Sequence, residues 1–504
     1  MKKRISAIIA CAMLLQSFSF GYDIVVDVAN NKIKNTVATS ILETQDTRTA
    51  TLELANHQLI GDFNVWYNPA QVNNYKGVYA EIWNGNPWGG TLTEAFGGTI
   101  GVFMGRGYLG NVQNHGTNIA HWINPKATQV EALPSGIASP FGINNDSFIY
   151  DLTALALGNK QIDVLYGREL SDRISGGLRL SFASATNEAE ARFEDTTVSF
   201  AGEGWEKNNQ KASDTQISAG LVIKDVGPAD TLDIVIGASL PKIDNTYTAE
   251  IELGASIFAK VNSTMKSDNN INLGASARAI KKAANGNVNI LTAGIDMGDT
   301  SAKWIEQFDN NIALFGWDNT NDEQTYDDKD TTIQIDYALH TMPSKKIKVI
   351  YAAGLVTYNR EITIEDRDKG IGALVASELM ADSVAKFTGF GVPIVVALEH
   401  QTTKRLVTRF AIGTQLMSSY KMTLRERDYY DINVDGVNET INQEDYREVT
   451  LTPRDITVDT SLGLGYKLTD DMDVDLAVSV TNADFFGTVT GACYVTQASV
   501  KYKF

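Results

Sequence analysis

The sequence predicts an all-β protein: antiparallel transmembrane strands that close into a barrel, preceded by a plug-like N-terminal segment. Three features support this prediction. Polar and apolar residues alternate along many short segments, short and long connections between these segments alternate, and the chain ends on a strand whose last residue is Phe504. Counting strands back from that end predicts about 14 of them, with about 16 as the alternative, because the number is even in such barrels.

Alternation is clearest in the segment 333–340, since successive side chains of a strand point to opposite faces. One face carries Ile333, Ile335, Tyr337 and Leu339, and the other carries Gln334, Asp336, Ala338 and His340. The same pattern predicts the strand pairs 162–166 with 174–182, 217–223 with 232–240, 271–280 with 288–297, 333–340 with 347–358, 394–401 with 405–416, and 455–467 with 472–481.

Connection lengths separate a barrel from a soluble sandwich, whose strands alternate in the same way. Short turns follow one strand, and long polar stretches follow the next. The long stretches are 185–214, 242–269, 298–330, 359–391 and 418–454. Short periplasmic turns and long outer loops are typical of outer-membrane barrels. The alternating segment 250–259 is interpreted as a hairpin inside one outer loop.

The N-terminus is typical of a secretory signal peptide covering residues 1–21. Lys2, Lys3 and Arg4 precede a short apolar run, and the small residues Ser19 and Gly21 precede a cut before Tyr22. A lipoprotein signal at Cys11 is the alternative. Either way, export is predicted, and after removal of residues 1–21 only Cys493 remains, so no intrachain disulfide is possible.

Charge and hydropathy narrow the destination of the exported chain. The formal net charge of −18 argues against nucleic acid as a partner. After the signal, no apolar run reaches the length of about 18 residues that a transmembrane helix needs. The expected location is therefore the outer membrane of a Gram-negative-type bacterium. The expected partners are outer-membrane lipid and lipopolysaccharide, the barrel assembly machinery and a small-molecule solute.

The C-terminal strand YVTQASVKYKF has a pattern of its own. Outer-membrane barrels resemble it in ending with alternating apolar residues and a terminal Phe that the assembly machinery recognises. The resemblance implies that Tyr502 and Phe504 form an assembly signal. Counting back, the first barrel strand lies at 99–106; including 78–83 would require one more strand before it. The predicted domains are residues 1–21, an N-terminal segment 22–97 and a barrel 98–504.

The N-terminal segment contains Asn68-Pro69-Ala70, preceded by the aromatic residues Trp66 and Tyr67. This stretch resembles the Asn-Pro-Ala segment of the long-chain fatty acid transporter family. The resemblance implies a segment that folds back as a hatch inside a fourteen-stranded barrel, and a hydrophobic solute. The alternative is a plain turn, since Asn and Pro favour turns. Residues 98–108 and the C-terminal part of the chain also resemble uncharacterised outer-membrane proteins of similar architecture.

Alternation also predicts which charged side chains face the barrel interior. They are Asp163, Arg168, Arg179, Lys224, Asp336, His340, Lys348, Glu399, Arg409, Asp459, Asp473 and Asp475. Mixed charges of this kind indicate a wet lumen. The alternative is that they pair with one another and only fill the barrel.

One outer loop, 431–442, resembles the opening of a calcium loop. Asp431, Asn433 and Asp435 place oxygen ligands at alternate positions before Gly436, but position twelve is Asn442 and not the usual Glu. The alternative is a solvated turn rich in Asp and Asn. No other cofactor is expected.

Catalysis has little support in the sequence. The chain has five His, and of these only His340 falls on the presumed lumen face, near a periplasmic turn rather than the outer rim. No enzyme is therefore predicted. The predicted function is a channel or transporter that passes small or hydrophobic solutes. The alternative is a non-conducting barrel with a structural, surface-adhesion or partner-binding role.

Overall fold

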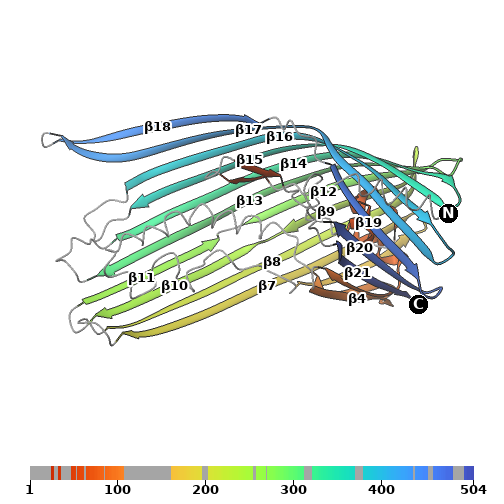
Figure 1. Cartoon of the computed structure of the whole chain (residues 1–504), viewed down its shortest axis with the longest axis horizontal. Helices are drawn as coiled ribbons and strands as arrows, with labels where there is room; N and C mark the ends of the chain where they lie inside the picture. The colour runs from red at the N-terminus through yellow and green to blue at the C-terminus, as the bar shows by residue number, and fades with distance from the viewer. Residues whose placement is uncertain are drawn as a thin grey trace.

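A single antiparallel sheet closes on itself in the computed structural model of the chain (Figure 1). Because β21 pairs with β3, the last and the first strands of the sheet join and complete the ring. The structure describes residues 24–27, 32–35, 47–52, 54–61, 64–83, 86–106, 161–195, 202–253, 257–267, 270–310, 320–368, 378–434, 437–451, 458–480 and 493–504. The all-β antiparallel barrel predicted from alternation is confirmed.

The strands fall into a short group and a long group. The short strands are β3 (Gly77–Trp83), β4 (Asn86–Ala95), β5 (Gly98–Arg106), β6 (Gln161–Ser171), β19 (Val458–Lys467), β20 (Met472–Val480) and β21 (Cys493–Lys503). The long strands are β7 (Ile174–Asp195), β8 (Gly202–Val226), β13 (Val288–Asn310), β14 (Thr320–Ser344), β15 (Ile347–Asp368), β16 (Glu378–Gln401) and β17 (Leu406–Val434).

Three positions in the wall are filled by two strand segments in succession. These segments are β9 (Ala229–Ser239) with β10 (Lys242–Leu253), β12 (Ile271–Lys282) with β11 (Ile257–Ser267), and β19 with β18 (Val437–Leu451). Both members of each pair bond to the same neighbour, β8, β13 and β17 respectively. The nineteen strand segments of the sheet therefore occupy sixteen strand positions around the barrel. Each such position, filled by one strand or by two in succession, is called here a stave.

The preferred count of fourteen was two staves short. The barrel begins at Gly77 and not at residue 98, because β3 and β4 belong to the wall. The alternating segment 250–259 does belong to a hairpin of its own, as predicted, because its described residues lie in β10 and β11, which pair with each other. This hairpin also pairs with β8 and β13, so it continues two staves of the wall away from the short turns.

Stave length differs sharply around the ring. The long strands have 22 to 29 residues and the short ones 7 to 11, and Figure 1 shows the long staves running well past the short ones. Crossing hydrocarbon takes about 10 residues of a tilted strand. Most of each predicted long outer loop is thus continued strand.

The outer face is apolar at alternate positions along the staves. Exposed apolar side chains include Ile82, Met104, Ile162, Leu178, Phe182, Ile217, Leu221, Ile236, Leu273, Leu291, Ile333, Ile335, Tyr351, Leu355, Val396 and Leu464. Monomeric soluble proteins rarely expose a continuous apolar surface of this extent. Lipid hydrocarbon would cover such a band favourably.

Seven short turns lie together at one end of the barrel, called here the short-turn end. They connect β4 to β5, β6 to β7, β8 to β9, β12 to β13, β14 to β15, β16 to β17 and β19 to β20. The strand β21 ends there, opposite the start of β3. Figure 1 shows the C-terminus at this end.

The described residues of the stretch 47–76, called here the inner segment, lie inside the ring. They contain α2 (Thr47–Thr51), η1 (Asn56–Gln58) and η2 (Pro69–Asn74), and a separate hairpin of β1 (Ile24–Asp27) and β2 (Lys32–Asn35) precedes them. The inner segment contacts staves on opposite sides of the barrel, including β5 to β8, β13, β14, β17 and β19 to β21. In the described part of the chain, no helix is long and apolar enough to cross a membrane.

Candidate functional site

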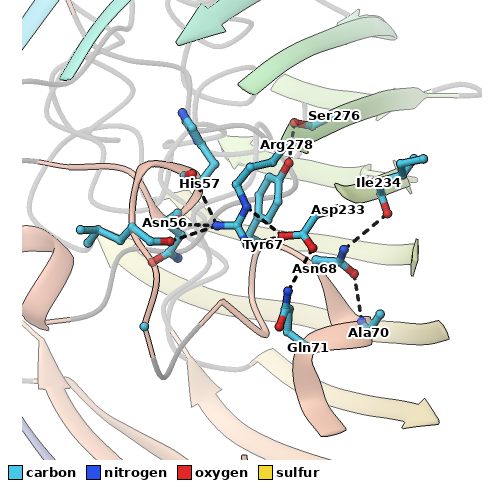
Figure 2. Close-up of polar contacts among 12 residues, drawn as sticks. Asn56, His57, Tyr67, Asn68, Ala70, Gln71, Asp233, Ile234, Ser276 and Arg278 are labelled. Atoms are coloured by element: carbon cyan, nitrogen blue, oxygen red, sulfur yellow. Dashed lines mark hydrogen bonds and ion pairs between the residues drawn. The ribbon is translucent and has the colours of Figure 1, made fainter. Parts of the chain in front are cut away.

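The candidate site is the interface between the inner segment and the inward face of the barrel. At its centre lies Arg278 of β12, whose side chain is fully buried (Figure 2). Its Nε donates to Asp233 Oδ2 over 2.8 Å, and Asp233 is the residue directly opposite on β9. Its Nη1 donates to the carbonyl oxygen of Leu59 over 3.0 Å. One guanidinium thus joins two staves to the backbone of the inner segment.

Further contacts complete this cluster. The guanidinium lies 4.7 Å from the centre of the Tyr67 ring, a cation–π distance. The Tyr67 hydroxyl lies 2.9 Å from Ser276 Oγ, and Gln71 Nε2 donates to the second oxygen of Asp233 over 3.1 Å (Figure 2). Because each partner of a buried charge is satisfied, removing any one would leave a costly unpaired group.

Two histidines bind the inner segment to stave β14. His57 Nε2 lies 2.8 Å from Asp336 Oδ2, and both side chains are buried. His340, on the same stave, has Nε2 at 2.8 Å from the carbonyl oxygen of Gln58. Both imidazoles therefore hydrogen-bond across the interface with the inner segment.

The Asn68-Pro69-Ala70 turn sits on a row of inward-facing glycines. Gly167, Gly177 and Gly220 are directly opposite one another on β6, β7 and β8. A Cβ added at Gly177 would overlap the backbone of Pro69, one at Gly220 would overlap Asn68 Oδ1, and one at Gly167 would lie 3.2 Å from the Pro69 carbonyl oxygen. The glycines leave the room that the turn occupies.

Asn68 fixes the turn in that place. Its Oδ1 accepts from the Ala70 backbone N–H over 2.9 Å, which caps η2. Its Nδ2 donates to the carbonyl oxygen of Leu221 in β8 over 3.0 Å. Pro69 is at the start of η2, where its missing N–H costs nothing. The motif is therefore both a turn and an attachment to the wall.

An aromatic cluster packs beside the glycine row. Trp66 lies edge-on to Phe103 and Trp88, with ring centres 4.9 and 5.8 Å away. Arg106 stacks on Trp66 at 4.5 Å and makes two hydrogen bonds, of 2.8 and 2.7 Å, to Asp163. A bulge at Gly105, whose φ is +78°, turns Arg106 inward.

The N-terminal part of the inner segment is held mainly by charge. Arg48 donates to both oxygens of Glu399, over 3.0 and 2.8 Å. Arg409 bridges Glu399 and Asp475, at 3.1 and 2.6 Å. Leu52, four residues after Arg48, belongs to an apolar cluster with small and β-branched residues of the wall. Among them are Ala338, Ala352, Ala397 and Ala411.

Most of the charged residues predicted to face the lumen lie there. Asp163, Arg179, Asp336, His340, Arg409 and Asp475 are buried in the interior, and Lys348, Glu399 and Asp473 are partly exposed in it. The prediction for Arg168 is wrong, because its side chain lies on the same face of the strand as Ile162 and not on the inward face of Asp163. Lys224 lies exposed at the short-turn end, and the side chain of Asp459 is outside the described residues.

The other predicted sites have separate outcomes. Asp431 and Asn433 fall in β17 near the tip of the hairpin with β18; their side chains, and Asp435 as a whole, lie outside the described residues. The leader 1–21 is likewise outside them. Tyr502 and Phe504 are exposed at the end of the closing stave, with ring centres 6.4 Å apart.

Sequence reasoning missed Arg48, His57, Asp233 and Arg278. Alternation does place Asp233 and Arg278 on the inward faces of their strands, because apolar residues such as Ile234 and Leu273 lie on the outward faces of the same strands. Pairing the hairpins would then have put them side by side. No pattern in the sequence marks Arg48 or His57, because their partners lie 351 and 279 residues away.

Comparison with known proteins gives little beyond this geometry. No protein-family model matches the chain, and no curated protein matches its sequence. Among solved structures, the translocator domain of the autotransporter NalP from Neisseria meningitidis is 14% identical, covers 65% of this chain and 88% of its own, and has a TM-score of 0.21. The ferric-catecholate import receptor Fiu from E. coli K12 is 7% identical, with coverages of 86% and 82% and a TM-score of 0.27. The alcaligin outer-membrane receptor FauA from Bordetella pertussis is 9% identical, with coverages of 68% and 73% and a TM-score of 0.23. At such scores these likenesses carry no argument about what this chain does.

Proposed function

We propose that the chain is an outer-membrane channel or transporter for small or hydrophobic solutes, and that the inner segment is its plug. The observation that carries the proposal is the position of residues 47–76 inside a closed ring, bonded to staves on several sides. A barrel with a purely structural role needs no removable segment in its lumen. Passage would then require the segment to move, and no covalent chemistry is needed.

Placement in the outer membrane rests on the two faces of the wall. The outer face is apolar at alternate positions, while the inner face carries buried charges such as Asp233 and Arg278. This is the arrangement of a barrel surrounded by lipid, with a polar interior. The signal peptide and the C-terminal Tyr502 and Phe504 would direct the chain to export and to the assembly machinery.

Orientation follows from the turns. Outer-membrane barrels have short periplasmic turns and longer outer connections, so the short-turn end would face the periplasm. The long staves would then rise above the outer surface, where lipopolysaccharide lies. The inner segment would close the barrel from its periplasmic end.

Single-channel conductance of the refolded protein in planar bilayers tests the proposal. We expect the full exported chain to be almost silent and a version lacking residues 22–75 to show large, steady openings. A version lacking only residues 22–46 is the matched control and should stay silent, because it keeps the inner segment. The proposal fails if the full chain conducts as well as the truncated one, which would indicate an open porin.

The rival function is a non-conducting barrel with a structural, adhesive or partner-binding role. It is favoured by one observation: staves of 22 to 29 residues continue well past the apolar band, and such walls could present a surface to other molecules. If neither the full chain nor either truncated version conducts, this second function is the better one.

A further inference from the structure

A recess of about 340 Å³ opens at the short-turn end, between Arg48 of the inner segment and the ends of staves β14 to β21. Nine of the side chains that line it are Lys or Arg, and three are carboxylates. The whole chain, in contrast, has a formal net charge of −18. Positive charge is therefore concentrated in this recess against the overall balance of the protein.

The floor of the recess contains paired charges with a cationic excess. Glu399 is shared by Arg48, Arg409 and Lys348, the last at 3.7 Å. Asp475 is shared by Arg409 and by Lys501, also at 3.7 Å. Four cations thus surround two carboxylates, so the floor remains positive after every ion pair is formed.

The rim adds four more cations from two adjacent turns. Lys345 and Lys346 lie in the turn between β14 and β15, and Lys404 and Arg405 lie in the turn between β16 and β17. The turns adjoin, since the Gln401 N–H donates to the Lys346 carbonyl oxygen over 2.8 Å. All four side chains are exposed, and none forms an ion pair with any residue that the structure describes.

We infer that this recess binds a small multivalent anion of the phosphate class from the aqueous phase. The rim supplies exposed charge that attracts an anion from solution, since clefts lined by one sign of charge concentrate ions of the other. The floor supplies guanidinium groups, which match phosphate oxygens in pairs. If the chain is a channel, as proposed above, the anion bound in this recess would be its solute. Only this assignment of the solute rests on the proposed function; the binding of the anion does not.

Arg48 gives the site a connection to the plug. It belongs to the inner segment and bonds to Glu399 of the wall. A phosphate group in the recess would offer Arg48 an alternative partner. Anion binding would therefore weaken the attachment of the segment at the point nearest the solute.

Isothermal titration of pyrophosphate into the refolded exported chain, at low ionic strength, tests the inference. The rim variant Lys345→Gln/Lys346→Gln/Lys404→Gln/Arg405→Gln changes only exposed turn residues and should fold. We expect it to bind at least about tenfold more weakly. The control Lys281→Gln/Lys282→Gln removes a dibasic pair beside another short turn, outside the recess, and should bind like wild type.

Two results would overturn the inference: a rim variant that binds like wild type, or a control that loses as much affinity as the rim variant. A third arm repeats the titration in nanodiscs of phosphatidylcholine with and without phosphatidylglycerol. Equal isotherms support a free anion, whereas loss of pyrophosphate binding in the phosphatidylglycerol discs would assign the recess to a lipid headgroup and overturn it.

The outcome is separable from that of the proposed function. Pyrophosphate binding by a barrel that stays silent in both truncated and full forms would support the site and reject the channel. Openings of the truncated form without any pyrophosphate binding would support the channel and reject the site.

Discussion

The two ends of the inner segment are held to the same barrel by different means. Near residue 48 the attachment is an ion pair whose side chains are 20% and 12% exposed, at the edge of a wet recess. Around residues 56–70 it is a fully buried guanidinium together with a backbone turn seated on glycines. Salt screens exposed charges but not close packing. The comparison indicates that the segment would detach first at Arg48 and last at Asn68.

The largest effect should come from the buried attachment. Arg278→Met leaves Asp233 charged in a dry environment, and removing one partner of a buried pair costs about 3–5 kcal/mol in the free energy of unfolding. Urea unfolding in lipid vesicles measures this. The double variant Arg278→Met/Asp233→Asn should recover much of the loss. A single variant as stable as wild type would contradict the deep attachment.

The next effect concerns shape alone. Gly177→Leu places a side chain where the Pro69 backbone lies, so the turn must leave its seat. Overpacking of this kind costs about 1–3 kcal/mol. We expect frequent openings in planar bilayers. Gly176→Ala is the control, because a Cβ there meets only the side chains of Leu170 and Leu221 on the other face. Equal behaviour of the two variants would show that the turn is not seated on Gly177.

A smaller effect is expected at the exposed ion pair. Arg48→Ala removes a partly exposed, charge-assisted pair worth about 1.5 kcal/mol and should raise the frequency of brief openings. In wild type, the same rise should appear between 0.1 and 1 M KCl, where the screening length falls from about 10 to about 3 Å. In the Arg48→Ala variant, salt should have little further influence. An equal response to salt in both proteins would show that another charge holds this end.

The smallest effect should come from Asn68→Ala, and comparison with Asn68→Asp then separates the two hydrogen bonds of Asn68. Asn68→Ala loses the cap of η2 and the bond to the wall, at a cost of about 1 kcal/mol. Asn68→Asp keeps the acceptor for the Ala70 N–H but loses the donor to Leu221. We expect Asp to be the more open of the two in bilayers, since it adds an unpaired charge at a buried position. An Asp variant as silent as wild type would mean that the turn is held by packing only.

Alternation along the chain was enough to predict the barrel. The strand count was harder to predict, because the sequence of residues 77–95 is not typical of strands. Stave β4 contains Pro87, Gly89 and Gly90, which are typical of turns. In the structure these glycines are needed, since a Cβ at Gly90 would overlap the Phe103 ring. Close packing inside the barrel thus requires glycines at positions where they make the sequence look like a turn.

The interior was predictable only as far as neighbouring staves reach. Glu399 and Arg409 lie directly opposite each other in one hairpin, and alternation placed both in the lumen. Arg48 joins the same cluster from 351 residues away. Whether Arg48 reaches this cluster depends on the path of the inner segment through the barrel, and no local sequence pattern predicts that path.

The closing pair of staves determines when the barrel can become complete. Gly77 lies opposite Lys503, so the ring cannot close until β21 has been delivered, long after β3. Pairings so distant in sequence form late, because the intervening chain must first be ordered. The inner segment is joined directly to Gly77 and is thus already beside the gap when its two edges meet. We expect the protein to emerge from assembly with its passage already blocked, and every opening to be a later event.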